Sequence, residues 1–391
     1  MSKQLSLYGI IRERINEAGG FIGFDQFMQA ALYEPELGYY DTKTVFGEKG
    51  DFVTASELGP WSTLAMADLV FNAWQQMGAP VAWTLIEQGS GSGQQLASLL
   101  DILVQWSMQM PTSVISVEHC AQLRNRQQKL FAERQLDVIL VASLRDVLAS
   151  EHVVFYSNEL PDAFPVPCFH YKQGVFYERG VGIDGDAFCW LDADKPMTII
   201  NQPMTHPPEI TNKLVANWPD SYISEYNPAL SVWQQELARI IQSGFVFTVD
   251  YGYSQQEYYR QARVEGTLLA HVDQTADEDV LSNPGSRDIT AHVDFSALVR
   301  AGKQAGLEPL LWMSQGGWLA QSPSVQALIQ SLAEQNDKLS MHLLAHAKRM
   351  LMPFGMGEVF KLLVQAKGLS AKKPEYLSQF DHLDVLELKS K

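Results

Sequence analysis

The fold class is decided by residues 82–93, AWTLIEQGSGSG. An apolar run that ends in closely spaced glycines is typical of a buried strand followed by a tight turn. Leu96, Leu99, Leu100 and Leu103 then recur at the spacing of an amphipathic helix. A strand, a glycine loop and a helix in this order are typical of the first unit of a nucleotide-binding α/β sheet.

Four further apolar runs follow the loop and alternate with helix-compatible stretches. They lie at 114–119, 137–143, 152–159 and 245–252, and an apolar run within 355–367 favours a late strand. Strands that alternate with helices predict parallel pairing through right-handed crossovers. We therefore expect an α/β protein with a Rossmann-like, mostly parallel sheet.

Two stretches fall outside this alternation. Residues 1–80 are predicted to be a mainly helical N-terminal cap segment, and residues 81–391 are predicted to carry the sheet. Between the fourth and fifth strands, at about 160–243, frequent prolines, glycines and aromatics predict a large insertion subdomain.

Charge and composition exclude several classes of protein. The 391 residues contain 29 Lys+Arg and 45 Asp+Glu, a formal net charge of −16, which argues against nucleic-acid and anionic-membrane partners. No run reaches the ~18 apolar residues of a membrane span. Three cysteines without paired spacing, and a start without a signal-peptide pattern, favour a cytoplasmic protein.

The glycine loop carries the clearest ligand signal. Glu87 precedes Gly89, Gly91 and Gly93, and this G-x-G-x-G spacing differs from the G-x-G-x-x-G of dinucleotide sites. A carboxylate at this point suits a cationic ligand better than a pyrophosphate. S-adenosylmethionine, which carries a sulfonium and an ammonium, fits both features. The alternative is a β–α turn without a ligand.

Acidic and amide side chains also stand at the ends of two later strands. Glu118 closes the strand after the loop, where acids hold ribose hydroxyls in nucleotide-binding sheets; a solvated strand end is the alternative. Asn158, Glu159 and Asp162 end the fourth strand, at the edge where ligands bind in open α/β sheets. Carboxylates there suit a guanidinium, although a capped turn around prolines would explain them too.

No metal site is predicted. His292 and Asp294, with His342 or His346, imitate an iron-binding triad, but that chemistry sits in an all-β barrel. Asp294 is better placed to cap the helix that starts at Phe295. Phosphate-loop and nucleophile-elbow motifs are absent from the sequence.

Taken in order, the motifs resemble the MidA family of S-adenosylmethionine-dependent methyltransferases, whose mitochondrial members are assembly factors of respiratory complex I. The matching stretches are AALYEPELGYYDTKTVFGEKGDFVTASELG, IEQGSGSG, SVEHCAQLRNRQ, SNELPDAFPV, FTVDYG, NPGSRDITAHVDFSAL, SQGGWL and LMPFGMGEVFKLL. They span nearly the whole chain, and G-D-F-[VI]-T-A and D-[IL]-T-A-H-V-D-F are distinctive to the family.

The resemblance implies a class I methyltransferase sheet with an N-terminal helical segment and a large insertion. It also implies protein arginine methylation with S-adenosylmethionine as cofactor, and a protein substrate bound through an arginine. The implied cofactor residues are Glu87, Gly89, Gly91, Gly93, Glu118, Asn158, Gly50, Asp51 and Thr54, and the implied catalytic residues are Glu159, Asp162 and His292.

The chain departs from the family pattern at several positions. Gln88, Ser90 and Ser92 replace the Leu, Pro and Arg of the usual E-L-G-P-G-R-G loop, and Pro161 stands where a Phe is usual. These departures keep one alternative open, a non-catalytic assembly or binding factor that retains the fold. A nicotinamide-dependent oxidoreductase is disfavoured by the glycine spacing. A homo-oligomer is left open.

Overall fold

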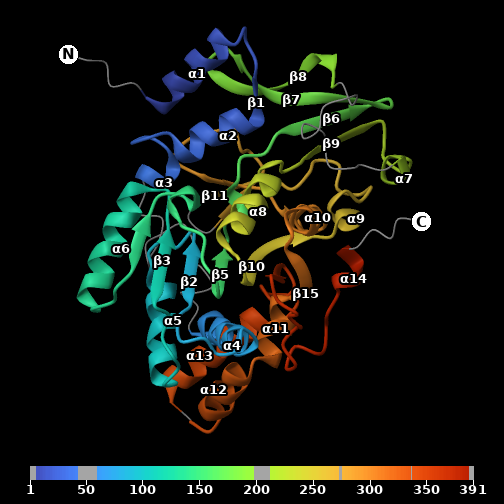
Figure 1. Cartoon of the computed structure of the whole chain (residues 1–391). Helices are drawn as coiled ribbons and strands as arrows, with labels where there is room; N and C mark the ends of the chain where they lie inside the picture. The colour runs from blue at the N-terminus through green and yellow to red at the C-terminus, as the bar shows by residue number, and fades with distance from the viewer. Residues whose placement is uncertain (1–5, 43–59, 198–211, 273–274, 336, 387–391) are drawn as a thin grey trace, which may run out of the picture.

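An eight-stranded, mostly parallel sheet forms the centre of the computed structural model, which describes residues 6–42, 60–197, 212–272, 275–335 and 337–386 (Figure 1). The strand order is β15-β16-β10-β5-β2-β3-β4, with β14 beside β10. From β4 to β10 neighbouring strands are parallel, whereas β16 is antiparallel to both β10 and β15. The bounds are β2 Thr84–Gln88, β3 Ser113–Val117, β4 Ile139–Val141, β5 Val153–Asn158, β10 Gly244–Tyr253, β14 Val293–Asp294, β15 Glu308–Ser314 and β16 Phe360–Lys367. The predicted α/β class with a mostly parallel sheet is confirmed.

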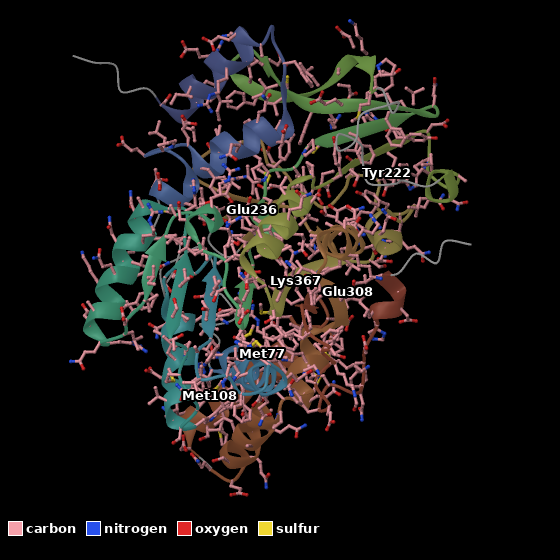
Figure 2. The ribbon with its side chains drawn as sticks, in the orientation of Figure 1. Met77, Met108, Tyr222, Glu236, Glu308 and Lys367 are labelled. Atoms are coloured by element: carbon pink, nitrogen blue, oxygen red, sulfur yellow. The ribbon has the colours of Figure 1, made fainter. Side chains whose placement is uncertain are left out.

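Helices cover both faces of this sheet. The side chains of each strand point alternately to one face and to the other, so each face has its own apolar core. Leu85 of β2 belongs to one apolar core and its neighbour Ile86 to the other. Met77 and Met108, labelled in the lower half of Figure 2, belong to the core around Leu85. That face carries α4 Trp61–Gln76, α5 Gln94–Gln105, α11 Gln315–Gln321, α12 Pro323–Ala333 and α13 Lys338–Leu351. The other face carries α8 Ala229–Ile240, α10 Phe295–Ala305 and α14 Leu383–Leu386.

The insertion forms a second, antiparallel sheet that the sequence did not resolve. Its order is β1-β7-β6-β9, and β8 also pairs with β7. The strands are β1 Ile22–Gly23, β6 Cys168–Lys172, β7 Val175–Asp184, β8 Ala187–Pro196 and β9 Ser221–Glu225. Strand β1 precedes the central sheet in sequence by about sixty residues, so the insertion sheet incorporates part of the N-terminal segment.

The N-terminal helices α1 Leu7–Glu17 and α2 Phe24–Tyr33 pack on this insertion sheet, at the top of Figure 1. The ring of Phe24 lies 4.9 Å from that of Trp190, and Phe27 lies 5.5 Å from Phe188. Helix α4, by contrast, packs in the core of the central sheet. The division of the chain at residue 80 stays a prediction.

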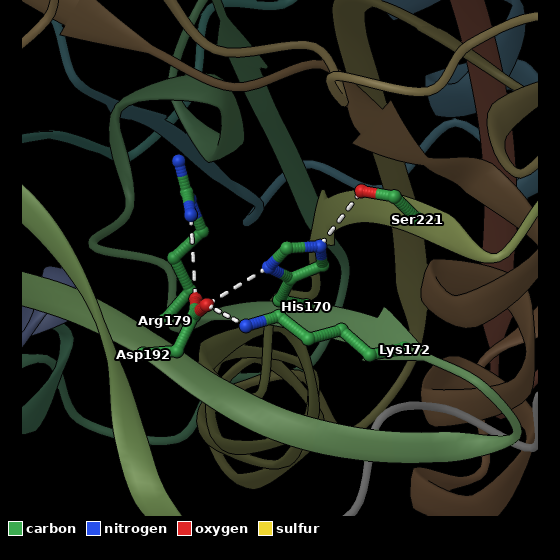
Figure 3. A network of polar contacts seen from close by, with 5 residues as sticks. All are labelled: His170, Lys172, Arg179, Asp192 and Ser221. Carbon is green, nitrogen blue, oxygen red and sulfur yellow. Dashed lines mark hydrogen bonds and ion pairs between the residues drawn. The ribbon is translucent and has the colours of Figure 1, made fainter.

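A polar network links the strands of the insertion sheet (Figure 3). The Asp192 carboxylate contacts His170 Nδ1 at 3.0 Å and Arg179 Nη1 at 3.3 Å, and it pairs with Lys172. His170 Nε2 lies 2.9 Å from Ser221 Oγ. Burial raises the pKa of Asp192, but the contacts with Lys172, His170 and Arg179 outweigh it and leave the pKa below its usual value. Because Lys172 and Arg179 already pair with the Asp192 carboxylate, we interpret this Ser-His-Asp arrangement as a link between strands and not as a catalytic triad.

The remaining elements are a small sheet, a helix of 13 residues and several short helices. A three-stranded sheet has the order β12-β11-β13. The bounds are β11 Leu269–Val272, β12 Thr275–Asp277, β13 Asp288–Thr290, α3 Tyr39–Thr42, α6 Ala121–Glu133, α7 Asn212–Val215, α9 Gln255–Tyr258, and the 3-10 turns η1 Leu144–Asp146 and η2 Pro161–Ala163. Within the described ranges, the helices are all too short or too polar to cross a bilayer.

Candidate active site

A cavity of about 540 Å³ opens at the carboxyl ends of β2, β3 and β5 and is bounded by residues of α2, α3 and β13. This is the edge at which open α/β sheets bind ligands. Among the described residues that line it there are six carboxyl groups and neither Lys nor Arg. The carboxyl groups belong to Asp41, Glu87, Glu118, Glu159, Asp162 and Asp288.

The glycine loop between β2 and α5 forms part of the cavity wall and requires its glycines. Gly89, Gly91 and Gly93 have φ angles of 74°, 51° and 77°, in the left-handed region. A Cβ at Gly93 would lie 2.9 Å from Phe131 Cζ and 3.0 Å from Gln127 Cγ. The predicted loop therefore exists, and its shape depends on residues that lack a side chain.

Glu87, near the end of β2 and beside the loop, is a buried carboxyl group that is costly to ionise. Its side chain is only 3% exposed, and its Oε2 has no hydrogen-bond partner among the described residues. Burial raises the pKa of Glu87 to about 7, although hydrogen bonds involving Ser90 and Tyr156 act in the opposite direction. A bound cation would offset this penalty, as predicted for a cationic ligand.

Glu118 holds the loop from the next strand. Its two carboxylate oxygens accept hydrogen bonds from the backbone N–H groups of Gly91 and Cys120, each at 3.0 Å. Burial raises the pKa of Glu118, and these two bonds partly lower it again. The side chain is 8% exposed, so the alternative of a solvated strand end is wrong.

A buried hydrogen-bond network lies behind the loop, and the sequence reasoning did not identify it. Ser116 Oγ lies 2.8 Å from both Ser90 Oγ and Gln127 Oε1. Gln127 Nε2 donates to the carbonyl of Gly91 at 2.9 Å. Ser90 therefore takes part in fixing the loop. Gln127 lies within helix α6, where no local signal distinguishes it from a surface residue.

The turn after β5 brings Asn158, Glu159 and Asp162 to the cavity together, as predicted. Asn158 Nδ2 donates to Glu159 Oε1 at 3.1 Å. Glu159 has a φ of 51°, a conformation that costs free energy for a residue with a side chain, and its N–H donates to Val249 O at 2.9 Å. The other described non-glycine residues with a positive φ do not line the cavity, so this conformation is notable here for the direction it gives the Glu159 turn.

Asp250 of β10 supports this turn and was not predicted as a site residue. Its Oδ2 accepts a hydrogen bond from the backbone N–H of Asp162 at 3.2 Å, and its Oδ1 accepts one from Tyr251 N at 2.8 Å. Burial raises the pKa of Asp250, and the neighbouring Asp162 raises it further. Burial also raises the pKa of Asp162. The two carboxyl groups thus resist being charged at the same time.

The opposite wall comes from segments far away in the sequence. The Tyr33 hydroxyl donates to Ala163 O at 2.8 Å, and the Tyr40 hydroxyl lies 3.1 and 3.2 Å from the two carboxyl oxygens of Asp288. The rings of Tyr33 and Tyr40 stack with centroids 5.4 Å apart. Sequence reasoning did not select these three residues.

Comparison with known proteins agrees with this geometry. A family model described as "Putative S-adenosyl-L-methionine-dependent methyltransferase" matches residues 65–313. The chain belongs to this family. A Burkholderia thailandensis crystal structure bound to S-adenosyl-homocysteine matches it with a TM-score of 0.82 and 29% identity, over 96% of this chain and 95% of that one.

Curated relatives are named mitochondrial protein arginine methyltransferases. The Bos taurus protein NDUFAF7 is 26% identical over 88% of this chain and 80% of its own length. The Drosophila melanogaster homologue is 23% identical over 94% of this chain and 86% of its own length. The relatives' location is part of their names, and the cytoplasmic location expected for this methyltransferase stays a prediction.

The residues of this methyltransferase fit S-adenosylmethionine, the cofactor of the family. The loop glycines take the left-handed conformations of a tight turn on the cavity wall, and the buried Glu87 Oε2 lacks a partner among the described groups. Gln88, one of the departures from the family pattern, accepts a hydrogen bond from Trp233 Nε1 at 2.9 Å. That departure therefore ties the loop to α8, and the glycines keep their conformations.

One predicted residue, His292, does not line the cavity, and three others lie outside the described residues. His292 lies behind the cavity, stacked on Tyr253 at 5.1 Å and edge-on to Tyr251 at 5.0 Å. Burial, with a contribution from Arg263, lowers the pKa of His292 to about 4, so its imidazole is neutral near pH 7. Gly50, Asp51 and Thr54 lie outside the described residues.

Asp294, part of the pattern that imitates an iron-binding triad, has a structural role. Asp294 Oδ1 accepts a hydrogen bond from Ala297 N at 3.0 Å and caps α10, as predicted. In the parts of the chain that the structure describes, His, Cys, Asp and Glu form no group of three that could hold a metal ion.

Proposed function

We propose that this methyltransferase transfers the sulfonium methyl group of S-adenosylmethionine to a side-chain nitrogen of an arginine in a protein. The observation that carries the proposal is the acidic cavity wall, with six carboxyl groups and no Lys or Arg among its described residues. A cationic cofactor and a cationic acceptor both suit such a wall. The names of the curated relatives support arginine as the acceptor.

The chain's residues would act mainly by position. When bound, S-adenosylmethionine supplies the electrophile: its sulfur–methyl bond breaks as the methyl–nitrogen bond forms, which leaves a neutral thioether. Glu159 and Asp162 hold the guanidinium through charge-assisted hydrogen bonds and orient one nitrogen. The methylated nitrogen gives up one proton, and we assign its acceptance to the Glu159 carboxylate.

The contacts that fix Glu159 support this assignment. Its N–H is fixed by Val249 of the neighbouring strand, and its side chain receives the Asn158 amide. The carboxylate is therefore oriented before any ligand arrives, and such preorganisation lowers the cost of reaching the transition state. The predicted role of His292 is not included, because a buried neutral imidazole behind the wall has no direct route to the cavity.

Glu159→Gln tests the proposal. We expect turnover to fall by about 100-fold or more, because the amide can neither accept the proton nor balance the guanidinium charge. Affinity for S-adenosylmethionine, measured by calorimetry, should stay within about three-fold. The assay follows labelled methyl transfer to a panel of arginine peptides, with methylarginine identified after hydrolysis.

Glu151→Gln is the matched control, since Glu151 is an exposed carboxylate just before the other end of β5. Its turnover should equal that of the unmodified enzyme. Unchanged turnover in Glu159→Gln would remove Glu159 from the mechanism. Label recovered only on residues other than arginine would overturn the proposed acceptor.

A further inference from the structure

We propose that Asp288 and Asp162 together form the seat for the acceptor guanidinium, under a roof made by Tyr33 and Tyr40. This inference rests on the proposed function and names the residues that would select an arginine. It gives β13 and the N-terminal helices a part in substrate recognition. The turn after β5 supplies only one side of the seat.

Asp288 is held in place on the cavity wall. It begins β13, is only 4% exposed and lines the cavity. The Tyr40 hydroxyl lies within 3.2 Å of each of its carboxyl oxygens. A hydroxyl that contacts both oxygens fixes the orientation of this carboxyl group, which faces the position we propose for the guanidinium.

Asp162 is brought next to the β13 segment by the backbone. Ala291 N, just after β13, donates to the Asp162 carbonyl at 2.9 Å. The Asp162 side chain is 4% exposed, and its Oδ1 has no hydrogen-bond partner among the described residues. The nearby Tyr251 hydroxyl lowers the pKa of Asp162 but does not reach hydrogen-bonding geometry. An unpartnered buried oxygen on a cavity wall is a group that a ligand donor would satisfy.

Both carboxyl groups act on the same pair of tyrosines. Burial raises the pKa of Tyr33 and of Tyr40, and the charges of Asp288 and Asp162 raise both further. The two hydroxyls therefore stay protonated and remain donors. The geometry agrees, because the Tyr40 hydroxyl contacts Asp288 and the Tyr33 hydroxyl bonds to the carbonyl of Ala163, the residue after Asp162.

This chemistry fits a guanidinium better than an ammonium. A guanidinium is planar, offers five donors in a fixed fork and stacks on aromatic faces, so it can bridge two carboxylates beside a tyrosine pair. An ammonium is a strongly hydrated point charge that cannot stack, so it gains less from contact with the tyrosine rings. The competing occupant is the α-ammonium of the cofactor itself.

The first experiment separates these two occupants. Asp288→Asn is titrated with S-adenosyl-homocysteine, which carries the ammonium, and with 5′-methylthioadenosine, which lacks it. We expect both affinities to stay within about three-fold of the unmodified protein. A loss of ten-fold or more for S-adenosyl-homocysteine alone would overturn the proposal, because Asp288 would then serve the cofactor.

The second experiment tests the seat directly. Blocked arginine (N-acetylarginine amide) is titrated by NMR into the complex with S-adenosyl-homocysteine, and blocked lysine serves as the competing probe. We expect Asp288→Asn to weaken blocked arginine by about ten-fold or more, since removing one partner of a buried charge pair leaves the other unbalanced. The control is Glu278→Gln, an exposed carboxylate between β12 and β13, which should bind as the unmodified protein does.

The outcomes distinguish this inference from the proposed function. Equal binding of blocked arginine by Asp288→Asn and the unmodified protein would overturn the seat and leave arginine methylation standing. No binding of blocked arginine by the unmodified complex, with blocked lysine bound, would overturn both. Thermal unfolding of each variant, measured in parallel, shows whether a loss of binding comes from loss of the fold.

Discussion

The two halves of the cavity are built in different ways. The half to which we assign the cofactor, the cofactor half, comes from adjacent strand–helix units, with the Gly89–Gly93 loop held by Glu118 and Gln127. The half to which we assign the acceptor, the acceptor half, is assembled from α2, α3, the turn after β5 and β13, which meet only in the folded chain. Backbone geometry dictates the first half, whereas docking of distant segments dictates the second. Substitutions in the first half should therefore cause large losses of cofactor affinity, whereas those in the second half should cause smaller changes in the KM for the acceptor.

The largest effect is expected from Gly93→Ala. The left-handed φ of 77° disfavours any side chain, and the added Cβ would collide with Phe131 Cζ at 2.9 Å. Since the loop must shift to relieve both, affinity for S-adenosylmethionine should fall by about 100-fold or more, with about 2 kcal/mol lost from the free energy of unfolding. Calorimetry and urea denaturation measure the two quantities.

Gly174→Ala is the matched control for backbone strain. Gly174 has a φ of 87°, but an added Cβ would meet nothing within 4 Å. It should lose about 1 kcal/mol of stability and keep its cofactor affinity. Equal loss of affinity in both variants would show that the glycine loop is not a special part of the cavity.

A smaller effect is expected from Glu87→Gln, which should raise the free energy of unfolding and lower the affinity for the cofactor. Because the pKa of Glu87 is raised from 4.5 to about 7, the folded protein binds this proton more tightly than the unfolded chain does. Stability is therefore lost as the pH rises from about 4.5 to about 7 and stays lost above that pH. Glu87→Gln should recover up to roughly 3 kcal/mol at pH 8 and nothing at pH 4, while cofactor affinity falls about ten-fold.

Denaturation of the cofactor-free protein at pH 4 and at pH 8 provides the measurement, and Glu151→Gln again removes a charge from the surface as a control. A stabilisation that is equal at the two pH values would contradict the raised pKa. A gain in stability without any loss of cofactor affinity would separate Glu87 from the cofactor half.

The smallest effect is expected from Tyr33→Phe, which acts on the acceptor half. Loss of the 2.8 Å hydrogen bond to Ala163 should cost about 1 kcal/mol of stability and raise the KM for an arginine peptide about three- to five-fold. The Kd for S-adenosylmethionine should not change. Tyr8→Phe, which removes a hydroxyl bonded to the backbone of Asp186, is the control. A change in the cofactor Kd would show that the two halves are coupled.

The same contrast explains what could be predicted from the sequence. The glycine loop, Glu118 and the Asn158–Asp162 turn follow from local patterns: glycines between a strand and a helix, and polar groups at strand ends. Tyr33, Tyr40 and Asp288 meet through contacts between residues about 130 and 248 positions apart, and no local pattern encodes such contacts. Asp250 was hidden because it lies inside an apolar strand.

Errors of fold have similar causes. The strands of the insertion were not predicted, because their partly exposed residues lack the continuous apolar runs of central parallel strands. Strand β15 was not predicted either, although it contains the apolar run 310–313. His292 shares a distinctive motif with family members, yet the structure packs it between aromatic rings behind the wall. A motif shows that residues belong together, and it does not show which of them face the ligand.

The packing of the N-terminal helices on the insertion sheet also affects the order in which the chain folds on the ribosome. Phe27 of α2 needs Phe188 of β8, and 188 − 27 = 161 residues separate them. At a synthesis rate of about 5–20 residues per second, the apolar face of α2 waits roughly 10–30 s for its partner. During that time the apolar face of α2 is uncovered in the nascent chain, and transiently exposed hydrophobic surface favours aggregation unless chaperones cover it. The roof proposed for the acceptor site is thus synthesised well before the strands on which its helices pack.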